Sequence, residues 1–287
     1  MNNRGKSFYA LFIFLVAEAI QIVAAAMILM ITGLIKIIGI VVNSGWKGLS
    51  EAGGMNTILQ QGVTQNMQYV ISVLGIVICG LIFFFWYQAE IRVEVRTSKK
   101  ILIDFKYFMI LLCLGFGCQF AFSGFMNIIQ KYLIKLFEDY AHQINTLQGG
   151  NSIIVLLLLA VIAPITEELI FRGVILHRTN RYISFLGANL LQATLFGIYH
   201  FNIVQGIYAA LLGFLLGLIY KKFNTIIAPI ILHMTVNISS YFLLLLPDKQ
   251  YVAVIIMLVG IATMVVTLRF LKISSLFTEK EEVVNLA

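Results

Sequence analysis

The amino-acid sequence predicts an all-α protein, a polytopic membrane bundle of about eight transmembrane helices. Hydrophobic residues make up 60% of the 287 positions and charged residues only 11%, whereas soluble domains carry about 25% charged residues. The mean hydropathy is +0.95. The apolar residues are gathered in runs that approach or exceed the roughly 20 residues a helix needs to cross a bilayer. The sequence between these runs is too short for a soluble domain of useful size.

Eight apolar runs define the expected helices. The first run is too long for one upright helix, so it is either a tilted helix with an interfacial piece or one long helix that leaves the bilayer, and Lys36 favours a break near Gly33. In the fourth run, Pro164 predicts a bend, and in the seventh Pro229 predicts a kink just before His233. The runs cover approximately residues 8–42, 67–86, 107–129, 152–177, 183–200, 203–220, 225–246 and 251–271.

The net charge of +7 does not indicate a nucleic-acid partner, because the basic residues lie in short loops between apolar runs. In such loops they orient a membrane protein and contact anionic lipid. We therefore expect membrane lipids as partners, and a multi-pass protein of the cell membrane with both termini cytoplasmic. In this orientation Lys36 is ambiguous, and the lysines and arginines that fall outside are only Lys47, Lys131, Lys135 and Lys249.

The fourth run carries two adjacent carboxylates and an arginine in an apolar surrounding, between Ala163 and Arg172. A charge in hydrocarbon costs roughly 2.5–3.5 kcal/mol on insertion scales, so these groups must be paired or lie in a polar cavity. Helical residues four apart share a face, so we expect Glu168 to pair with Arg172 and Glu167 to point elsewhere. A carboxylate without such a partner suits general-base catalysis. A structural ion network of all three charges is the alternative.

Two later runs carry the other polar groups that suit hydrolysis. Phe196 and His200 lie one helical turn apart, as do His233 and Asn237. Either pair alone is also typical of helix packing. Together, a carboxylate, two imidazoles and an amide can deprotonate a water and stabilise the oxyanion of a tetrahedral intermediate. The sequence therefore predicts that the three segments meet in one intramembrane active site.

Several further residues are expected to support this site. Gly213 and Gly217 form a G-x-x-x-G pattern that allows close helix contact. His200 would lie too deep if its helix stood upright, and the uncharged residues that follow it predict a hairpin tip that stays submerged. Other intramembrane polar residues are expected to line the same cavity or to pair with neighbouring helices, namely Glu18, Gln21, Asn189, Gln192 and Gln205.

In order and spacing, these motifs resemble those of the CPBP intramembrane proteases, also called the Abi or type II CAAX-prenyl endopeptidase-like family. The resemblance covers about residues 153–241 and implies a CAAX-type endopeptidase that depends on a glutamate. The three motifs are Glu167-Glu168-x-x-x-Arg172, Phe196-x-x-x-His200 and His233-x-x-x-Asn237.

The resemblance also implies a role for each motif residue. Glu167 and His200 would activate water, and His233 and Asn237 would stabilise the oxyanion. Glu168, Arg172 and Phe196 would have supporting roles. The substrate would be a membrane-associated peptide or the C-terminal tail of a lipidated protein, and some members of the family are linked to bacteriocin immunity.

The predicted domain organisation follows from this resemblance. Residues 1–150 form about three N-terminal transmembrane helices with their loops, and residues 151–247 form the catalytic core. Residues 248–287 form the last transmembrane helix and a cytoplasmic tail.

Two histidines and a carboxylate are also the ligand set of several catalytic zinc sites. However, neither His200 nor His233 lies in an H-E-x-x-H helix, and Asn237 would be an unusual zinc ligand. We therefore favour a mechanism without metal or other cofactor.

Two other classes of function stay open at this point. A non-proteolytic membrane protein, such as a bacteriocin-immunity or binding protein, would keep the helix bundle without using Glu167 chemically. A transporter would use the buried charges as an ion path, but the sequence lacks two halves with matching broken helices.

Overall fold

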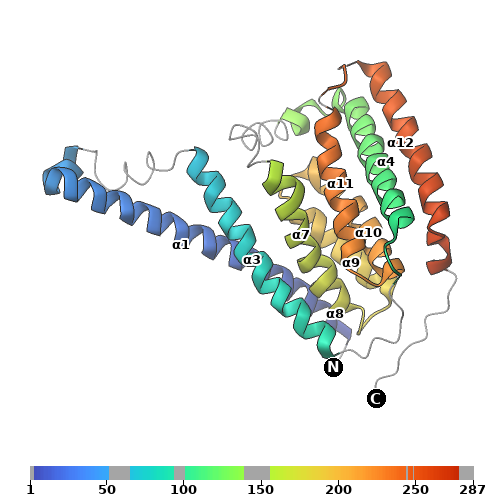
Figure 1. Ribbon diagram of the computed structural model, residues 1–287, viewed down its shortest axis with the longest axis horizontal. Coiled ribbons are helices and arrows are strands. Elements are labelled where there is room, and N and C mark those ends of the chain that lie inside the picture. Colours follow the sequence, from blue (N-terminus) through green and yellow to red (C-terminus); the bar gives the residue numbers. More distant parts are fainter. Residues whose placement is uncertain are drawn as a thin grey trace.

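The computed structural model shows a bundle built from helices (Figure 1). It describes residues 3–51, 65–93, 101–138, 156–243, 245–247 and 249–277. Within these ranges every regular element is helical, which confirms the predicted all-α fold. The main helices are α1 (Asn3–Glu51), α3 (Gln65–Val93), α4 (Phe105–Gln130), a composite helix, α9 (Phe185–Ile198), α10 (Ile203–Phe223), α11 (Ile227–Leu243) and α12 (Gln250–Phe270).

The composite helix changes its winding along its length. It consists of η1 (Leu158–Ile162), α7 (Ala163–Glu168), η2 (Leu169–Leu176) and α8 (His177–Thr179), where η1 and η2 are π-helical. π-Helical turns are rare and occur frequently at functional sites. This helix carries the two adjacent carboxylates predicted to form the site.

Five of the described helical segments are long and apolar enough to cross a membrane, so the chain is an integral membrane protein. They lie in α1, α3, α4, α10 and α12. The helices α9 and α11 are apolar but shorter. The described chain therefore supports a multi-pass bundle, and the crossing of all eight predicted segments stays a prediction.

The helix α9 is too short to cross a bilayer. Its 14 residues span about 21 Å at 1.5 Å per residue, against roughly 30 Å of hydrocarbon. The turn that follows exposes Phe201, which is 77% accessible. An exposed apolar side chain at the tip of a short hairpin suits contact with lipid, and the submerged position stays a prediction.

The first helix agrees with one of the two predicted alternatives, a single long helix. It is one continuous helix of 49 residues, so the break expected near Gly33 is wrong. A single glycine costs a helix interior only about 1 kcal/mol, and the long stem of Lys36 lets its ammonium reach polar surroundings. At 1.5 Å per residue the helix is about 73 Å long, more than twice the thickness of the hydrocarbon core.

Pro229 does not kink its helix. The helix α11 begins at Ile227, so Pro229 lies in the first turn. Backbone N–H groups of the first turn have no intrahelical partner, so proline is tolerated there. The predicted kink before His233 is therefore wrong.

The N-terminal helices are fastened to the composite helix by Glu90 at the end of α3. Its carboxylate accepts hydrogen bonds from Arg178 at 2.7 Å and from Trp86 at 3.1 Å, and Arg181 lies 3.0 Å away. The guanidinium of Arg178 also lies over the ring of Tyr9 in α1, 5.4 Å from its centroid. These contacts bring α1 and α3 against the helix that carries the carboxylates.

The G-x-x-x-G pattern of α10 permits close helix contact, as predicted, and the structure shows that the partner is α9. A Cβ atom built on Gly213 would lie 2.9 Å from Cδ1 of Phe196, and one on Gly217 would overlap Oδ1 of Asn189. The Asn189 amide donates to the carbonyl of Phe214 at 3.0 Å. The two glycines therefore bring α10 directly against the segment that carries Phe196.

We expect Gly217→Val to destabilise the bundle by about 1–3 kcal/mol, because the added side chain overpacks the α9–α10 contact. Gly39→Val is the matched control, since a Cβ at Gly39 meets nothing within 4 Å. Thermal unfolding of the two purified variants in the same detergent measures the difference. Equal midpoints would contradict the packing role of Gly217.

Candidate active site

The centre of the site is a buried ion pair within the composite helix. Arg172 Nη1 lies 2.9 Å from Glu168 Oε1, and both side chains are completely buried. The second guanidinium nitrogen, Nη2, donates to the carbonyl of Gly213 at 2.9 Å. The predicted pair of residues four apart is confirmed, and Arg172 also ties the composite helix to α10.

The imidazole of His233 lies between the two carboxylates. Its Nδ1 is 2.8 Å from Glu168 Oε1, and its Nε2 is 3.6 Å from Glu167 Oε2. An ionised carboxylate only accepts hydrogen bonds, so Nδ1 carries a proton and donates it to Glu168. This arrangement directs Nε2 towards Glu167.

Glu167 differs from Glu168 in its surroundings. Among the described ion pairs, its contact is with His233, on another helix, and not with Arg172. Its side chain is 12% exposed, whereas that of Glu168 is fully buried. Glu167 is therefore the carboxylate that can reach a water or substrate molecule.

His200 reaches the same site from the end of α9. Its Nδ1 lies 2.8 Å from the carbonyl oxygen of Phe196. A carbonyl cannot donate, so Nδ1 carries the proton and Nε2 is left to accept one. His200 is also close enough to Glu167 to interact with it electrostatically. The structure thus combines a carboxylate and an imidazole nitrogen with acceptor capacity.

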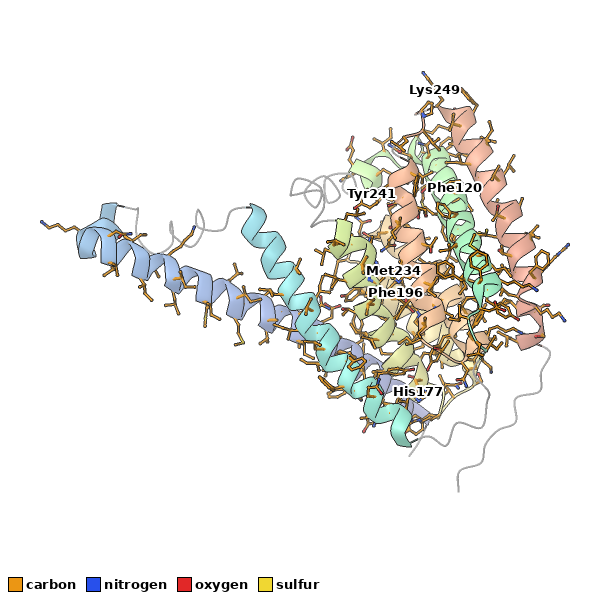
Figure 2. All side chains as sticks on the ribbon, in the orientation of Figure 1. Phe120, His177, Phe196, Met234, Tyr241 and Lys249 are labelled. Carbon is orange, nitrogen blue, oxygen red and sulfur yellow. The ribbon has the colours of Figure 1, made fainter. Side chains whose placement is uncertain are left out.

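The ring of Phe196 joins all three motifs. Its centroid lies 5.0 Å from the ring of His200 and 5.7 Å from that of His233, both in perpendicular arrangement. The Arg172 guanidinium lies 4.7 Å from the same centroid. Figure 2 shows Phe196 in the middle of the bundle, between His177 near one end and Lys249 at the other. The predicted supporting role of Phe196 therefore has a structural basis in packing.

Asn237 contacts the composite helix where Pro164 leaves a gap in its hydrogen bonding. In η1 the N–H of Ala163 bonds to the carbonyl of Leu158, five residues earlier. The next bond of this pattern would join residue 164 to Leu159, but proline has no N–H. Asn237 Nδ2 donates to that carbonyl instead, at 2.7 Å. Pro164 is thus accommodated by π-helical winding together with a side chain from α11.

Two amides predicted to lie near the site form a second layer around the ion pair. Gln192 Nε2 donates to the carbonyl of Gly213 at 2.9 Å, the same oxygen that Arg172 contacts, and to Asn189 Oδ1 at 2.7 Å. Gln205 contributes its backbone N–H to the cap formed by Asn202 at the start of α10. The contacts of Gln192 hold the Gly213 carbonyl that binds Arg172, and the Asn202 cap fixes the α9–α10 hairpin.

Sequence reasoning missed Tyr199, which directly precedes His200. Its ring centroid lies 5.8 Å from that of His200 and 5.5 Å from that of Phe171. Its hydroxyl accepts a hydrogen bond from Gln21 of α1 at 2.7 Å. The sequence feature that could have indicated its role is a tyrosine, an aromatic residue with a hydroxyl group, directly before a motif histidine.

The absence of a metal from the site stays a prediction. Among the described residues, no three His, Cys, Asp or Glu side chains are grouped to hold one ion. The Glu168 oxygen that faces His233 is also bound by the Arg172 guanidinium, whose positive charge opposes a cation there.

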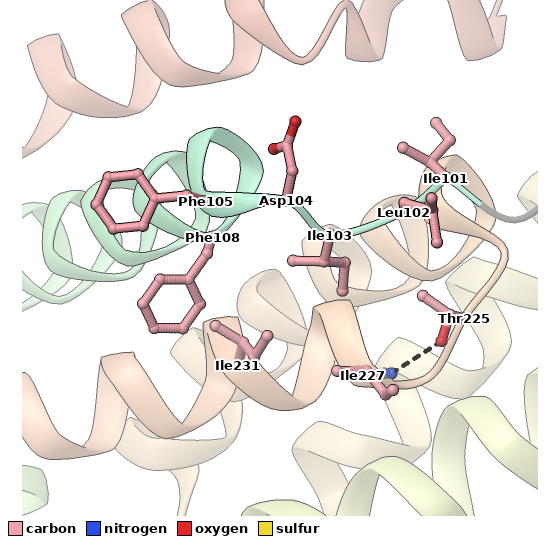
Figure 3. Close-up of a pocket in the computed structure, with 9 residues that line it drawn as sticks. All are labelled: Ile101, Leu102, Ile103, Asp104, Phe105, Phe108, Thr225, Ile227 and Ile231. Atoms are coloured by element: carbon pink, nitrogen blue, oxygen red, sulfur yellow. Dashed lines mark hydrogen bonds between the residues drawn. The ribbon is translucent and has the colours of Figure 1, made fainter.

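A separate apolar cavity of about 640 Å³ lies where α4 and α11 begin (Figure 3). The backbone N–H of Ile227 bonds to Thr225 at its edge. No residue of the predicted site lines this cavity, so it does not hold the chemistry. Its lining is Ile101, Leu102, Ile103, Asp104, Phe105, Phe108, Thr225, Ile227 and Ile231.

Comparisons with known proteins agree with the motif resemblance. Residues 149–239 match the family described as type II CAAX prenyl endopeptidase Rce1-like, and this segment contains every predicted site residue. The chain is also 22% identical over 195 residues to "Putative membrane peptidase YdiL" of Bacillus subtilis (strain 168), which covers 67% of this chain and 79% of that protein. No solved structure matches the chain significantly. The comparisons support an intramembrane protease.

Proposed function

We propose that this protein is an intramembrane endopeptidase in which Glu167 and His200 activate a water molecule for attack on a peptide carbonyl. The observation that carries the proposal is the placement of Glu167. It is a partly accessible carboxylate that faces His233 of α11 and lies near His200, while the adjacent Glu168 neutralises Arg172. Two neighbouring glutamates thus have different surroundings, which suits one of them to proton transfer.

In the proposed reaction, the water oxygen bonds to the carbonyl carbon while Glu167 takes one proton from the water. His200 Nε2 holds the water by accepting its other hydrogen, since Nδ1 is committed to the Phe196 carbonyl. The carbon–nitrogen bond then breaks, and the leaving amine receives the proton that Glu167 took. General acid–base catalysis of this kind contributes roughly 10²–10⁴-fold to the rate.

The oxyanion of the tetrahedral intermediate would be stabilised from α11. In the proposal His233 acts as an imidazolium, whose Nδ1–H donates to Glu168. Its Nε2–H would then donate to the oxyanion. The Asn237 amide has two N–H groups, and the one that does not bind Leu159 can donate there as well.

Glu168 and Arg172 support this chemistry without taking part in proton transfer. Glu168 holds the His233 ring through Nδ1, and Arg172 compensates the charge of Glu168. Fixing the orientation of a histidine through its second nitrogen is a common role of a buried carboxylate.

We propose as substrate a membrane-associated peptide, or the C-terminal tail of a protein, prenylated or unmodified. The site lies among apolar helices, so a substrate held in the membrane reaches it without crossing water. We place the protein in the cell membrane with both termini cytoplasmic. In Figure 1, α1 begins and α12 ends at the same end of the bundle, which supports placing both on one side.

The proposal is tested with purified protein in lipid and a panel of quenched peptides, prenylated and unmodified. We expect His200→Ala to lower kcat by about 10²–10⁴-fold. His177→Gln, in a histidine outside the site, should keep the wild-type rate. We expect a chelator to leave the wild-type rate unchanged. Activity that is lost on chelation and restored by zinc would contradict the metal-free mechanism.

A further inference from the structure

A glutamine of the first helix reaches the turn that carries His200. Gln21 of α1 donates from Nε2 to the hydroxyl of Tyr199 at 2.7 Å, across 178 positions of the sequence. The same Nε2 lies 4.0 Å from the sulfur of Cys79 in α3, and that thiol in turn lies 4.0 Å from the carbonyl of Ala17. The Gln21 side chain is therefore held between α1, α3 and the turn after α9.

The turn after α9 contains a residue in an unfavourable backbone conformation. Phe201 has a φ of 49°, in the left-handed region that is unfavourable for a non-glycine residue. Such a conformation persists only when the surroundings hold it. The neighbouring apolar side chains Ile198 and Ile203 are 53% and 61% exposed, so they do not anchor the turn in the bundle. Tyr199 at this turn contacts α1 through Gln21 and the composite helix through Phe171.

Tyr199 links Gln21 to His200, because it contacts both residues directly. The two residues are adjacent, and their rings meet nearly perpendicularly, with centroids 5.8 Å apart. On its other side, Tyr199 contacts Phe171 of the composite helix, 5.5 Å between centroids. A shift of the Tyr199 hydroxyl would therefore move the His200 imidazole.

We propose that Gln21 and Tyr199 form a tether that positions His200, which makes α1 part of the active-site assembly although the reacting groups lie on later helices. Both are positioning residues. The positioning of His200 by this tether does not depend on the reaction, whereas the predicted loss of turnover rests on the proposed function. Since a misplacement of about 1 Å can cost 10²-fold in rate, loss of the tether should lower turnover more than substrate binding.

The test uses Tyr199→Phe, Gln21→Leu and the double variant, in the full-length protein in lipid. Tyr199→Phe keeps the ring contacts and removes only the hydroxyl. Thr194→Val is the matched control, because this α9 hydroxyl is exposed and bonds within its own helix to Leu190. We expect each tether variant to lower kcat about tenfold with KM within about twofold. The double variant should be no slower than the slower single variant, because all three remove the same contact.

A second readout is independent of hydrolysis. With histidine labelled at ring carbon Cε1, the NMR signal of His200 can be assigned by its loss in His200→Ala, since the chain has four histidines. We expect this signal to shift or broaden in both tether variants and to stay unchanged in Thr194→Val. This NMR measurement tests the tether even if the wild-type protein cleaves none of the peptides. In that case only the proposed function fails. Unchanged His200 signals, or kcat losses that add in the double variant, would overturn the tether.

Discussion

Replacing Glu167 with glutamine is expected to lower the rate of peptide cleavage by at least about 10³-fold, within the range for loss of a general base. The amide has nearly the same shape as the carboxylate but does not take up the proton of an attacking water. The fold should survive, because the buried ion pair that stabilises the composite helix is formed by Glu168 and Arg172. Single-turnover cleavage in lipid measures the loss, and thermal unfolding shows whether the bundle is intact.

Glu167→Asp is the matched comparison for this variant. It keeps the carboxylate but withdraws it by one methylene group from His233 Nε2, which lies 3.6 Å away in the wild type. We expect a rate between those of wild type and Glu167→Gln. A glutamine variant that cleaves as fast as the aspartate variant would show that the charge of this residue is not needed.

Replacing Arg172 with methionine is expected to have the largest effect on stability, about 3–5 kcal/mol of destabilisation. The guanidinium is completely buried and is the cation that compensates Glu168. Its removal also breaks the hydrogen bond to Gly213 and the contact with the Phe196 ring. Equilibrium unfolding in detergent, followed by loss of helical circular dichroism, measures the effect.

The double variant Glu168→Gln/Arg172→Met separates charge compensation from packing. The neutral amide needs no cation, so we expect the double variant to be more stable than Arg172→Met alone. Activity should stay low, because His233 loses the carboxylate that holds its Nδ1. An Arg172→Met protein as stable as wild type would contradict the role assigned to the pair.

The sequence was sufficient for the architecture because hydropathy is a local property. The apolar runs correspond closely to the described helices. The G-x-x-x-G pattern predicted a close helix contact, which α10 makes with α9. The expectations that failed concern single residues. Lys36 and Gly33 did not interrupt α1, because a single glycine costs a helix little. Pro229 did not kink α11, because it lies in the first turn of that helix.

The candidate site could be predicted as a set of residues but not as a geometry. Helical spacing was enough to pair Glu168 with Arg172, since both lie on one helix. The position of His233 between the two glutamates depends on how α11 packs against the composite helix. The bond from Asn237 to Leu159 depends on π-helical winding, which has no simple sequence signature. Such long-range contacts follow from tertiary packing.

Cleavage of a membrane-embedded peptide under single-turnover conditions in H₂¹⁸O, analysed by mass spectrometry, tests most directly whether Glu167 activates water for peptide hydrolysis. With wild-type protein and a chelator present, we predict that the new carboxyl group of the product carries one ¹⁸O atom, and that Glu167→Gln gives no labelled product in the same time. A first-turnover product without ¹⁸O would show that an enzyme group attacks the carbonyl instead of water. Labelled product formed by Glu167→Gln at the wild-type rate would contradict the role of Glu167 itself.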